Sequence, residues 1–439
     1  MKLNSIKSVL HVLRYGVFAR VWPYLSHGMV WLLGPRFAAY LSSRTIDWGD
    51  ASQGPVVLCL FRESFVKDIH EMRQRTDMRF AVVMGGFTRF QEVWFPQEMQ
   101  IQTFYQSYRG PGRERALALS RRYADHLVRY VERKRPVQAV LSANFDYWQE
   151  VGLKQVCKEK NIPFVVLSRE HPVIPEICDI VTDWYVRSAY AFEGDLIAVA
   201  GDSSKQVLAR IRTVCRDDQV LVTGLPRFDA WRDVDCSMPW HERRCITLLT
   251  FTEGYFADQG FVETLRVFLQ AAQRHRGSGL RFLIKTKDAH DQHMVQQMIP
   301  VEQNMFVDCT HEEDLFNVLP LSRCVVGYNS LSQVEAVMAG CQLVIPAWGE
   351  CLDRGASVMY SADDPVVAEV VDFAYNPNAL LEKIEHAVIG HERRHSRECI
   401  DAFVARYVRI PRGTTSSHEV VACIQDAILK RRSGVTAVR

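Results

Sequence analysis

Short, wholly apolar runs alternate along the chain with longer stretches whose apolar residues recur at helical spacing. Such alternation predicts buried parallel strands joined by helices. A first series of expected strands covers residues 56–61, 80–84, 137–143, 164–168, 196–200 and 220–223, with a clear helix at 113–134. A second series covers 246–251, 282–285, 305–307, 324–327 and 343–346, with a helix at 261–274. The pattern predicts an α/β protein with two doubly wound, Rossmann-like domains.

A polar stretch at residues 231–244, which contains Asp233, Asp235 and Pro239, separates the two series and has the composition of a linker. Two such domains that face each other form a central cleft at the carboxyl ends of their strands, where ligands of these sheets bind. We expect four segments: a basic amphipathic helical segment at 1–50, a first domain at 51–235, a second domain at 236–410, and a C-terminal helix with a basic tail at 411–439.

Composition narrows the class of protein. The 439 residues are 48% hydrophobic and 24% charged, which excludes a disordered, collagen-like or coiled-coil chain. Lys and Arg number 53 and Asp and Glu 51, so the net charge of +2 provides no general attraction for nucleic acid. The 12 cysteines include no C-x-x-C pair, which favours a reducing cytoplasm. No apolar run of about 18 residues predicts a membrane-spanning helix.

The first 44 residues are basic, and no acidic residue precedes Asp47. Apolar and aromatic residues are interspersed among the basic ones, a pattern that suits a helix lying on an anionic membrane surface. A helical hairpin packed on the first domain is the alternative. We therefore expect a cytoplasmic protein, and peripheral contact of residues 1–44 with the inner face of the cytoplasmic membrane stays open.

Residues 325–340 read as a strand, a polar turn and a short helix. Ser330 and Gln333 have the spacing of a capping box, so the helix is expected to begin at Asn329 or Ser330. Its free N–H groups and dipole would hold phosphate, and Glu335 would accept hydrogen bonds from ribose hydroxyls. Plain helix capping with a solvated Glu335 is the alternative. The expected nucleotide-binding set on this element is Tyr328, Asn329, Ser330, Leu331, Ser332, Gln333 and Glu335.

Polar residues follow several other expected strands. Lys285 and Lys287 end a strand of the second domain, where ammonium groups could neutralise a leaving phosphate without a metal, unless they are merely solvated. The acids and histidines at 288–293 lack the spacing of a metal site, and we expect no metal. In the first domain, two apolar strands stop in polar residues at the sheet rim, where side chains usually touch substrate. These residues are Asn144, Asp146, Arg169, Glu170 and His171.

The run Tyr-Asn-Ser-Leu-Ser-Gln-Val-Glu-Ala at 328–336 resembles the nucleotide-binding element of bacterial GT-B glycosyltransferases, particularly the capsule-synthesis and Kdo-transferase-like group. The run Leu-Val-Thr-Gly-Leu-Pro-Arg-Phe-Asp at 221–229 is similar to a stretch that closes the N-terminal domain of polyol-phosphate, capsule and surface-carbohydrate transferases. With the two-domain layout, the similarity covers most of residues 55–400. It implies a metal-independent glycosyltransferase of bacterial surface polysaccharide synthesis, making lipopolysaccharide O-antigen or capsule.

The resemblance assigns roles to the polar residues. The first domain would bind the glycan acceptor through Asn144, Asp146 and His171, with Glu170 as general base. Asp229 would be a nucleophile if the Kdo-transferase likeness holds, or an acid that only pins Arg227 in its turn. Arg169, Gly224 and Arg227 would contact the donor sugar. No cofactor is implied, because the nucleotide-sugar, CMP- or UDP-linked, is a substrate.

CMP-Kdo is the leading donor, since Arg169, Arg227 and Lys287 could pair with an acidic sugar. Three other functions fit the same layout. They are a sugar-nucleotide epimerase, a polyol-phosphate transferase, and a non-catalytic sugar-binding subunit of a polysaccharide assembly complex. The oligomeric state stays open.

Overall fold

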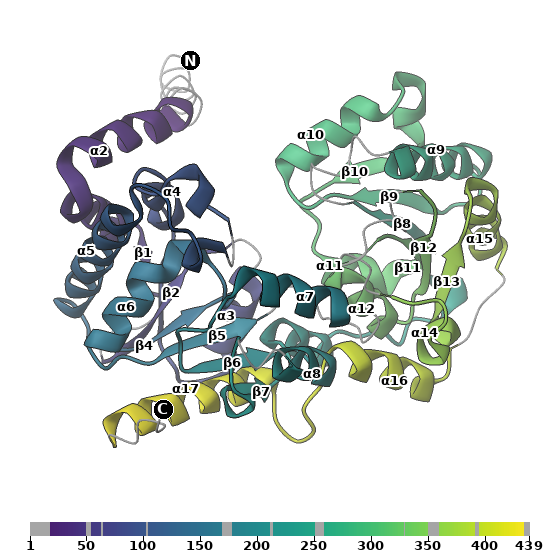
Figure 1. Cartoon of the computed structure of the whole chain (residues 1–439). Coiled ribbons are helices and arrows are strands. Elements are labelled where there is room, and N and C mark those ends of the chain that lie inside the picture. The colour runs from purple at the N-terminus through teal and green to yellow at the C-terminus, as the bar shows by residue number, and fades with distance from the viewer. Residues whose placement is uncertain are drawn as a thin grey trace, which may run out of the picture.

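The computed structural model describes residues 18–49, 54–62, 65–101, 104–168, 178–210, 214–250, 259–328, 330–349, 360–390 and 395–433. These residues form two α/β domains, each built around one sheet (Figure 1). In the first sheet the strand order is β1-β3-β2-β4-β5-β6-β7, parallel except for β1. Its strands are β1 (Ile46–Asp47), β2 (Val56–Leu60), β3 (Phe80–Val83), β4 (Val137–Ser142), β5 (Phe164–Ser168), β6 (Leu196–Val199) and β7 (Val220–Val222).

The second sheet is parallel throughout its described strands and has the order β10-β9-β8-β11-β12-β13. Its strands are β8 (Cys245–Leu249), β9 (Arg281–Lys285), β10 (Asp308–Thr310), β11 (Ser322–Val326), β12 (Gln342–Pro346) and β13 (Val371–Ala374). The strands β2, β8 and β12 are buried at every position, as expected for sheets with helices on both faces. The predicted pair of doubly wound sheets is thus confirmed.

Helices cover both sheets. Those that precede the second sheet are α2 (Phe18–Arg44), α3 (Val66–Arg75), α4 (Phe87–Glu92), α5 (Arg113–Glu132), α6 (Val151–Glu159), α7 (Cys178–Ser188), α8 (Asp202–Arg210) and the 3-10 segment η8 (Pro226–Arg232). Those that follow are α9 (Gln259–Arg274), α10 (Ala289–Met298), α11 (Leu315–Val318), α12 (Leu331–Met338), α14 (Pro365–Val370), α15 (Pro377–Ile389), α16 (Arg397–Tyr407) and α17 (Ser416–Arg432).

One expected strand is wrong. Residues 305–307 do not form it, because Val301–Phe306 is a 3-10 helix that begins after Pro300, and the strand β10 starts only at Asp308. Val301 and Met305 are largely exposed, so the apolar residues of this stretch do not mark a buried strand. The short β1 and the edge strand β13 were not expected. The boundaries of the four expected segments stay a prediction.

The C-terminal helix α17 returns to the first domain and lies along its sheet (Figure 1). The chain reaches it through α16, which packs against α12 and α14 of the second domain and against α8 of the first. A single apolar cluster contains residues of both domains, including Phe65 and Phe228 on one side and Leu319 and Val334 on the other. The two domains therefore meet through packed apolar side chains.

Helix α2 bends at Gly34, whose backbone is left-handed (φ 74°) and precedes Pro35. Glycine adopts this conformation without the strain of a side chain, and proline disfavours a helical residue before it. After the bend, Ala38 and Ala39 are buried against the first domain. The described part of the chain contains no helix whose length and apolarity would let it cross a bilayer.

Candidate functional site

The start of α12 confirms the predicted capping box. Ser330 is the N-cap, and its hydroxyl accepts a hydrogen bond from the Ser332 backbone N–H (3.2 Å). The Gln333 side-chain oxygen accepts one from the Ser330 N–H (3.3 Å). Ser330, Leu331 and Ser332 are partly exposed. The positive end of the helix therefore lies within reach of an anion, as the sequence indicated.

Glu335, one turn further along α12, is not presented to a ligand in this conformation. Its side chain is fully buried, which contradicts the expectation of an accessible or solvated carboxylate. Its Oε1 accepts hydrogen bonds from the Arg227 Nη2 (2.8 Å) and Nε (3.3 Å). Within the described residues, its Oε2 is buried and has no hydrogen-bond donor. One carboxylate oxygen of Glu335 is thus paired with Arg227, and the other accepts no hydrogen bond within the described residues.

Arg227 reaches Glu335 from the first domain, where η8 carries it. Its backbone N–H donates to the Asp68 carboxylate at the start of α3 (3.0 Å). Burial alone would lower the pKa of Arg227, but the carboxylates of Glu335 and Asp68 raise it above its ordinary value. The guanidinium is therefore a permanent cation, paired across the domain interface and not directed at a donor sugar.

Other expected donor contacts are engaged within the protein. The Tyr328 hydroxyl lies against Thr264 and the Gly260 carbonyl of α9. Gly224 has φ 73°, and a Cβ there would collide with the Arg409 carbonyl oxygen, so this glycine permits close packing of the chain. These two positions have structural roles in this conformation, contrary to their assignment as ligand contacts.

The two lysines after β9 differ in their surroundings. Lys285 is half-buried, and its Nζ donates to the carbonyl oxygens of Thr286 (2.6 Å) and His311 (3.0 Å). Burial, with the positive charge of Lys67, lowers its pKa below the ordinary value. Lys287 is exposed. Lys287 is therefore the lysine of this pair that is open to a phosphate.

Asp229 accepts hydrogen bonds from the start of α17, whose N-cap is Thr415, and is not available as a nucleophile. It is buried (2% exposed), and its two oxygens accept hydrogen bonds from the Ser416 N–H (2.9 Å), the Ser417 N–H (2.8 Å) and the Ser417 hydroxyl (2.7 Å). A carboxylate with both oxygens occupied by donors at a helix start has a stabilising role. The alternative, that Asp229 only pins Arg227 in its turn, does not describe the structure either, because the hydrogen-bond partners of Asp229 lie on α17.

Asn144 and Asp146 follow β4, as expected, but both are buried in the first domain. The Asn144 side-chain oxygen accepts a hydrogen bond from the Phe145 N–H (2.8 Å), and the Tyr185 hydroxyl donates to Asp146 (3.3 Å). Neither side chain is open to a glycan in this conformation. Arg169, Glu170, His171 and Asn329 lie outside the described residues, and their assigned roles stay predictions.

Two buried ionisable side chains that the sequence did not single out lie beside these residues. Glu150 and Lys154 lie at the start of α6, and both are buried. The Ser142 hydroxyl is 2.8 Å and 2.7 Å from the two Glu150 carboxylate oxygens, and the Lys154 Nζ donates to the Phe145 carbonyl (2.9 Å). Burial raises the pKa of Glu150 from 4.5 to about 7, although the charge of Lys154 opposes this shift. In the sequence, the only indication of this arrangement is that Glu150 follows closely after the aromatic residues Tyr147 and Trp148.

The raised pKa of Glu150 predicts a pH dependence of stability. Because the folded protein holds this proton more tightly than the unfolded chain, the stabilisation is complete below about pH 4.5 and is lost as the pH rises to about 7. We expect the stability of Glu150→Gln relative to the wild type to be roughly 1–3 kcal/mol more favourable near pH 8 than near pH 4.5, because glutamine does not titrate. Denaturant titrations at both pH values measure this. The exposed Glu132→Gln control should behave as wild type, and equal effects of Glu150→Gln at both pH values would contradict the assignment.

Further apolar and charged contacts between the domains lie around η8 and α11. The Trp231 and Phe316 rings are 4.9 Å apart, and the Lys67 Nζ is 3.2 Å from the Asp314 carboxylate. Lys67 belongs to α3 of the first domain and Asp314 caps α11 of the second. Together with the Arg227–Glu335 pair, these contacts hold the carboxyl edge of the second sheet against the first domain.

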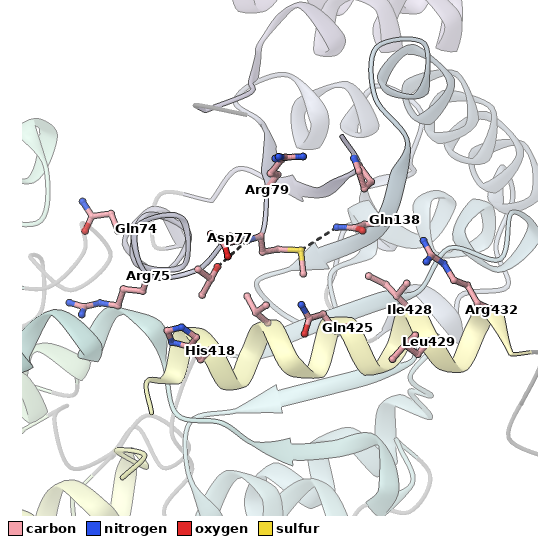
Figure 2. Close-up of a pocket in the computed structure, with 14 residues that line it drawn as sticks. Gln74, Arg75, Asp77, Arg79, Gln138, His418, Gln425, Ile428, Leu429 and Arg432 are labelled. Carbon is pink, nitrogen blue, oxygen red and sulfur yellow. Dashed lines mark hydrogen bonds between the residues drawn. The ribbon is translucent and has the colours of Figure 1, made fainter. Parts of the chain in front are cut away.

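A cavity of about 780 Å³ lies elsewhere, between the end of α3 and helix α17 (Figure 2). Arg79 and Gln138 border it near the amino ends of β3 and β4, and His418 and Arg432 border it from α17. The opposite ends of these strands carry the polar residues described above. Ligands of parallel sheets bind at carboxyl ends, so this cavity does not correspond to the expected nucleotide site.

Among the described residues, no group of three or more His, Cys, Asp or Glu side chains is arranged to hold a metal ion. Asp288, in the acid- and histidine-rich stretch 288–293, caps α10 by accepting a hydrogen bond from the Asp291 N–H (2.9 Å).

Comparison with known proteins places the fold. No family model matches the sequence, and no curated protein matches it. UDP-GlcNAc 2-epimerase from Neisseria meningitidis, solved with UDP-GlcNAc, aligns with a TM-score of 0.51 and 12% identity over 85% of this chain and 100% of that one. The wall teichoic acid polymerase TagF aligns with a TM-score of 0.51 and 12% identity over 98% and 99% of the two chains.

The α,α-trehalose 6-phosphate synthase from Burkholderia multivorans gives a TM-score of 0.50 and 10% identity, over 88% of this chain and 99% of that one. These neighbours include epimerases and transferases, and they share the GT-B arrangement of two parallel-sheet domains. At such low identity the likeness shows the fold alone. The chain therefore has a GT-B fold, as expected, and the comparisons do not confirm the narrower Kdo-transferase-like group.

Proposed function

We propose that this protein is a GT-B enzyme that takes a nucleotide-activated sugar as donor and transfers the sugar to a glycan acceptor. One observation carries the proposal. At the start of α12, a capped and partly exposed helix end is followed by the Glu335 carboxylate, one oxygen of which has no donor among the described residues. A helix end suits a phosphate, and a fixed carboxylate suits vicinal ribose hydroxyls.

Nucleotide binding then requires a change at the domain interface. Glu335 is fully buried and paired with Arg227, so a ribose can reach it only when the second domain separates from η8. In our proposal the ribose hydroxyls replace the Arg227 guanidinium as donors to Glu335. The phosphates lie at Ser330–Ser332, and the exposed Lys287 side chain supplies a positive charge to them. Closure of the domains around the donor would exclude water.

For the transfer step, we retain Glu170 as the general base. Its carboxylate would take the proton from an acceptor hydroxyl, whose oxygen bonds to the anomeric carbon while the bond from that carbon to the phosphate oxygen breaks. The nucleotide leaves with the bonding electrons and the negative charge. Because Asp229 is committed to α17, we propose a single displacement with inversion, in place of the retention expected from a nucleophilic Asp229.

The donor remains to be assigned by experiment. CMP-Kdo was favoured partly because Arg227 could pair with an acidic sugar, but Glu335 neutralises that cation. The support for an acidic sugar therefore rests on Lys287 and on Arg169. We propose surface-polysaccharide synthesis as the setting and include CMP, CDP, UDP and GDP as candidate leaving groups.

Thermal stabilisation by these four nucleotides tests the donor site. We expect one of them to raise the unfolding midpoint by about 3 °C or more at saturating concentration, because it binds the folded state alone. The Arg227→Met/Glu335→Gln variant, which removes both charges of this pair, should lose this shift. The matched Lys383→Met/Asp372→Asn variant removes another ion pair of the second domain and should keep it. Indifference of the wild-type protein to all four nucleotides would refute the proposal.

Product analysis with the stabilising nucleotide's sugar donor separates the candidate functions. A transferase consumes the donor only when a glycan acceptor is present, whereas an epimerase converts the donor alone. A polyol-phosphate transferase leaves phosphate in the product, and a binding subunit changes neither substrate. The epimerase is the strongest second candidate, because the neighbouring folds include UDP-GlcNAc 2-epimerases.

A further inference from the structure

Three consecutive apolar side chains are strongly exposed on helix α2. Trp31, Leu32 and Leu33 have 69%, 74% and 57% of their surface accessible. Single exposed apolar residues are ordinary, but three exposed around one helix end, about 100° apart and including a tryptophan, are a feature of surfaces that contact another apolar phase. We call these three residues the apolar corner.

The backbone explains why the corner is exposed. It immediately precedes the bend at Gly34, and the segment after the bend turns its apolar residues, among them Ala38 and Ala39, onto the first domain. Figure 1 shows the part of α2 before the bend standing apart from the body of the first domain. Val30 is buried, so the helix is anchored directly before the corner. A packed helical hairpin explains the buried residues of α2 but not the corner.

The charged residues next to the corner in the sequence are all positive. Residues 1–46 contain six Lys or Arg residues and no Asp or Glu. Arg36 lies three residues from Leu33 and is exposed, and within the described residues it forms no ion pair. An exposed apolar corner in a segment of sequence that carries cations and no acids matches the two phases of an anionic lipid surface, namely acyl chains below and phosphates above.

We propose that the apolar corner docks this protein onto a bilayer that contains anionic phospholipid. Trp31, Leu32 and Leu33 enter the boundary between headgroups and acyl chains, where tryptophan is favoured, and Arg36 lies among the lipid phosphates. A second copy of this chain would be a poor occupant, because two such basic surfaces repel each other. The proposal is independent of the donor site, since it uses no residue of α12 or η8.

Flotation of the full-length protein with vesicles tests the proposal. We expect binding to vesicles of phosphatidylcholine mixed with phosphatidylglycerol, and much weaker binding to phosphatidylcholine alone. Trp31→Ser/Leu32→Ser should reduce the bound fraction at least about tenfold, because two large apolar side chains are lost. Arg36→Gln should reduce it about fivefold, and added salt should weaken wild-type binding.

The control Val301→Ser/Met305→Ser removes two similarly exposed apolar residues from the second domain and should bind as wild type. All variants should unfold at the wild-type temperature, because the altered side chains are exposed. Failure of the wild type to bind anionic vesicles, equal binding to neutral vesicles, or full binding by the corner variant would each overturn the proposal. Concentration-dependent dimerisation that the corner variant loses, without vesicle binding, would assign the corner to a second copy instead.

Discussion

The Asp229→Ala variant should unfold with a free energy about 3 kcal/mol lower than that of the wild-type chain. The change removes the acceptor of three hydrogen bonds, from the N–H groups of Ser416 and Ser417 and from the Ser417 hydroxyl. Buried donors left without an acceptor are costly, and the positive end of α17 also loses a carboxylate, although Thr415 still caps the helix. Urea unfolding followed by circular dichroism measures the difference.

Asp235→Ala is the matched control for this prediction, because Asp235 is an exposed aspartate only six residues away. It should unfold at the wild-type urea concentration. A nucleophilic Asp229 predicts the opposite pattern, in which the alanine variant is as stable as wild type and merely inactive. That pattern would restore the retaining mechanism which the hydrogen bonds of Asp229 argue against.

Local patterns in the sequence were sufficient to predict most of the two sheets. The strand β5 has the predicted bounds, because an apolar run between turns is itself the cause of a buried parallel strand. The start of α12 was also predictable, since the capping box acts between residues three apart. In contrast, residues 305–307 resembled a strand only by apolarity, and nothing local distinguishes buried from exposed apolar residues.

The partners of the polar residues could not be predicted in the same way. Asp229 accepts hydrogen bonds from residues 187 and 188 positions later, and Glu335 pairs with an arginine 108 positions earlier. These contacts depend on the return of α17 to the first domain and on how the two sheets meet. A carboxylate after a strand looks the same in sequence whether it caps a helix or faces a substrate. This is why the positions of Asn144 and Asp146 after β4 could be predicted from the sequence, while the partners of Asp229 and Glu335 could not.

The buried ion pair between Arg227 and Glu335 should give the largest single-substitution effect in the domain interface. Arg227→Met leaves the Glu335 carboxylate buried without its cation, and we expect it to lower the free energy of unfolding by about 3–5 kcal/mol. Methionine keeps only the aliphatic part of the arginine side chain, so the loss reports the guanidinium group with its charge and hydrogen bonds. Denaturant unfolding of the full-length chain measures this.

A double-mutant cycle with Glu335→Gln then isolates the pair. Because both charges of the pair are removed together, the Arg227→Met/Glu335→Gln double variant should recover most of the stability lost in Arg227→Met, and the coupling should be at least about 2 kcal/mol. The exposed Lys67–Asp314 pair crosses the same interface and should show a coupling below about 1 kcal/mol. Additive effects at Arg227 and Glu335 would mean that the two side chains do not hold the domains together. In that case Glu335 would already be free for a ribose, and nucleotide binding would need no exchange of partners.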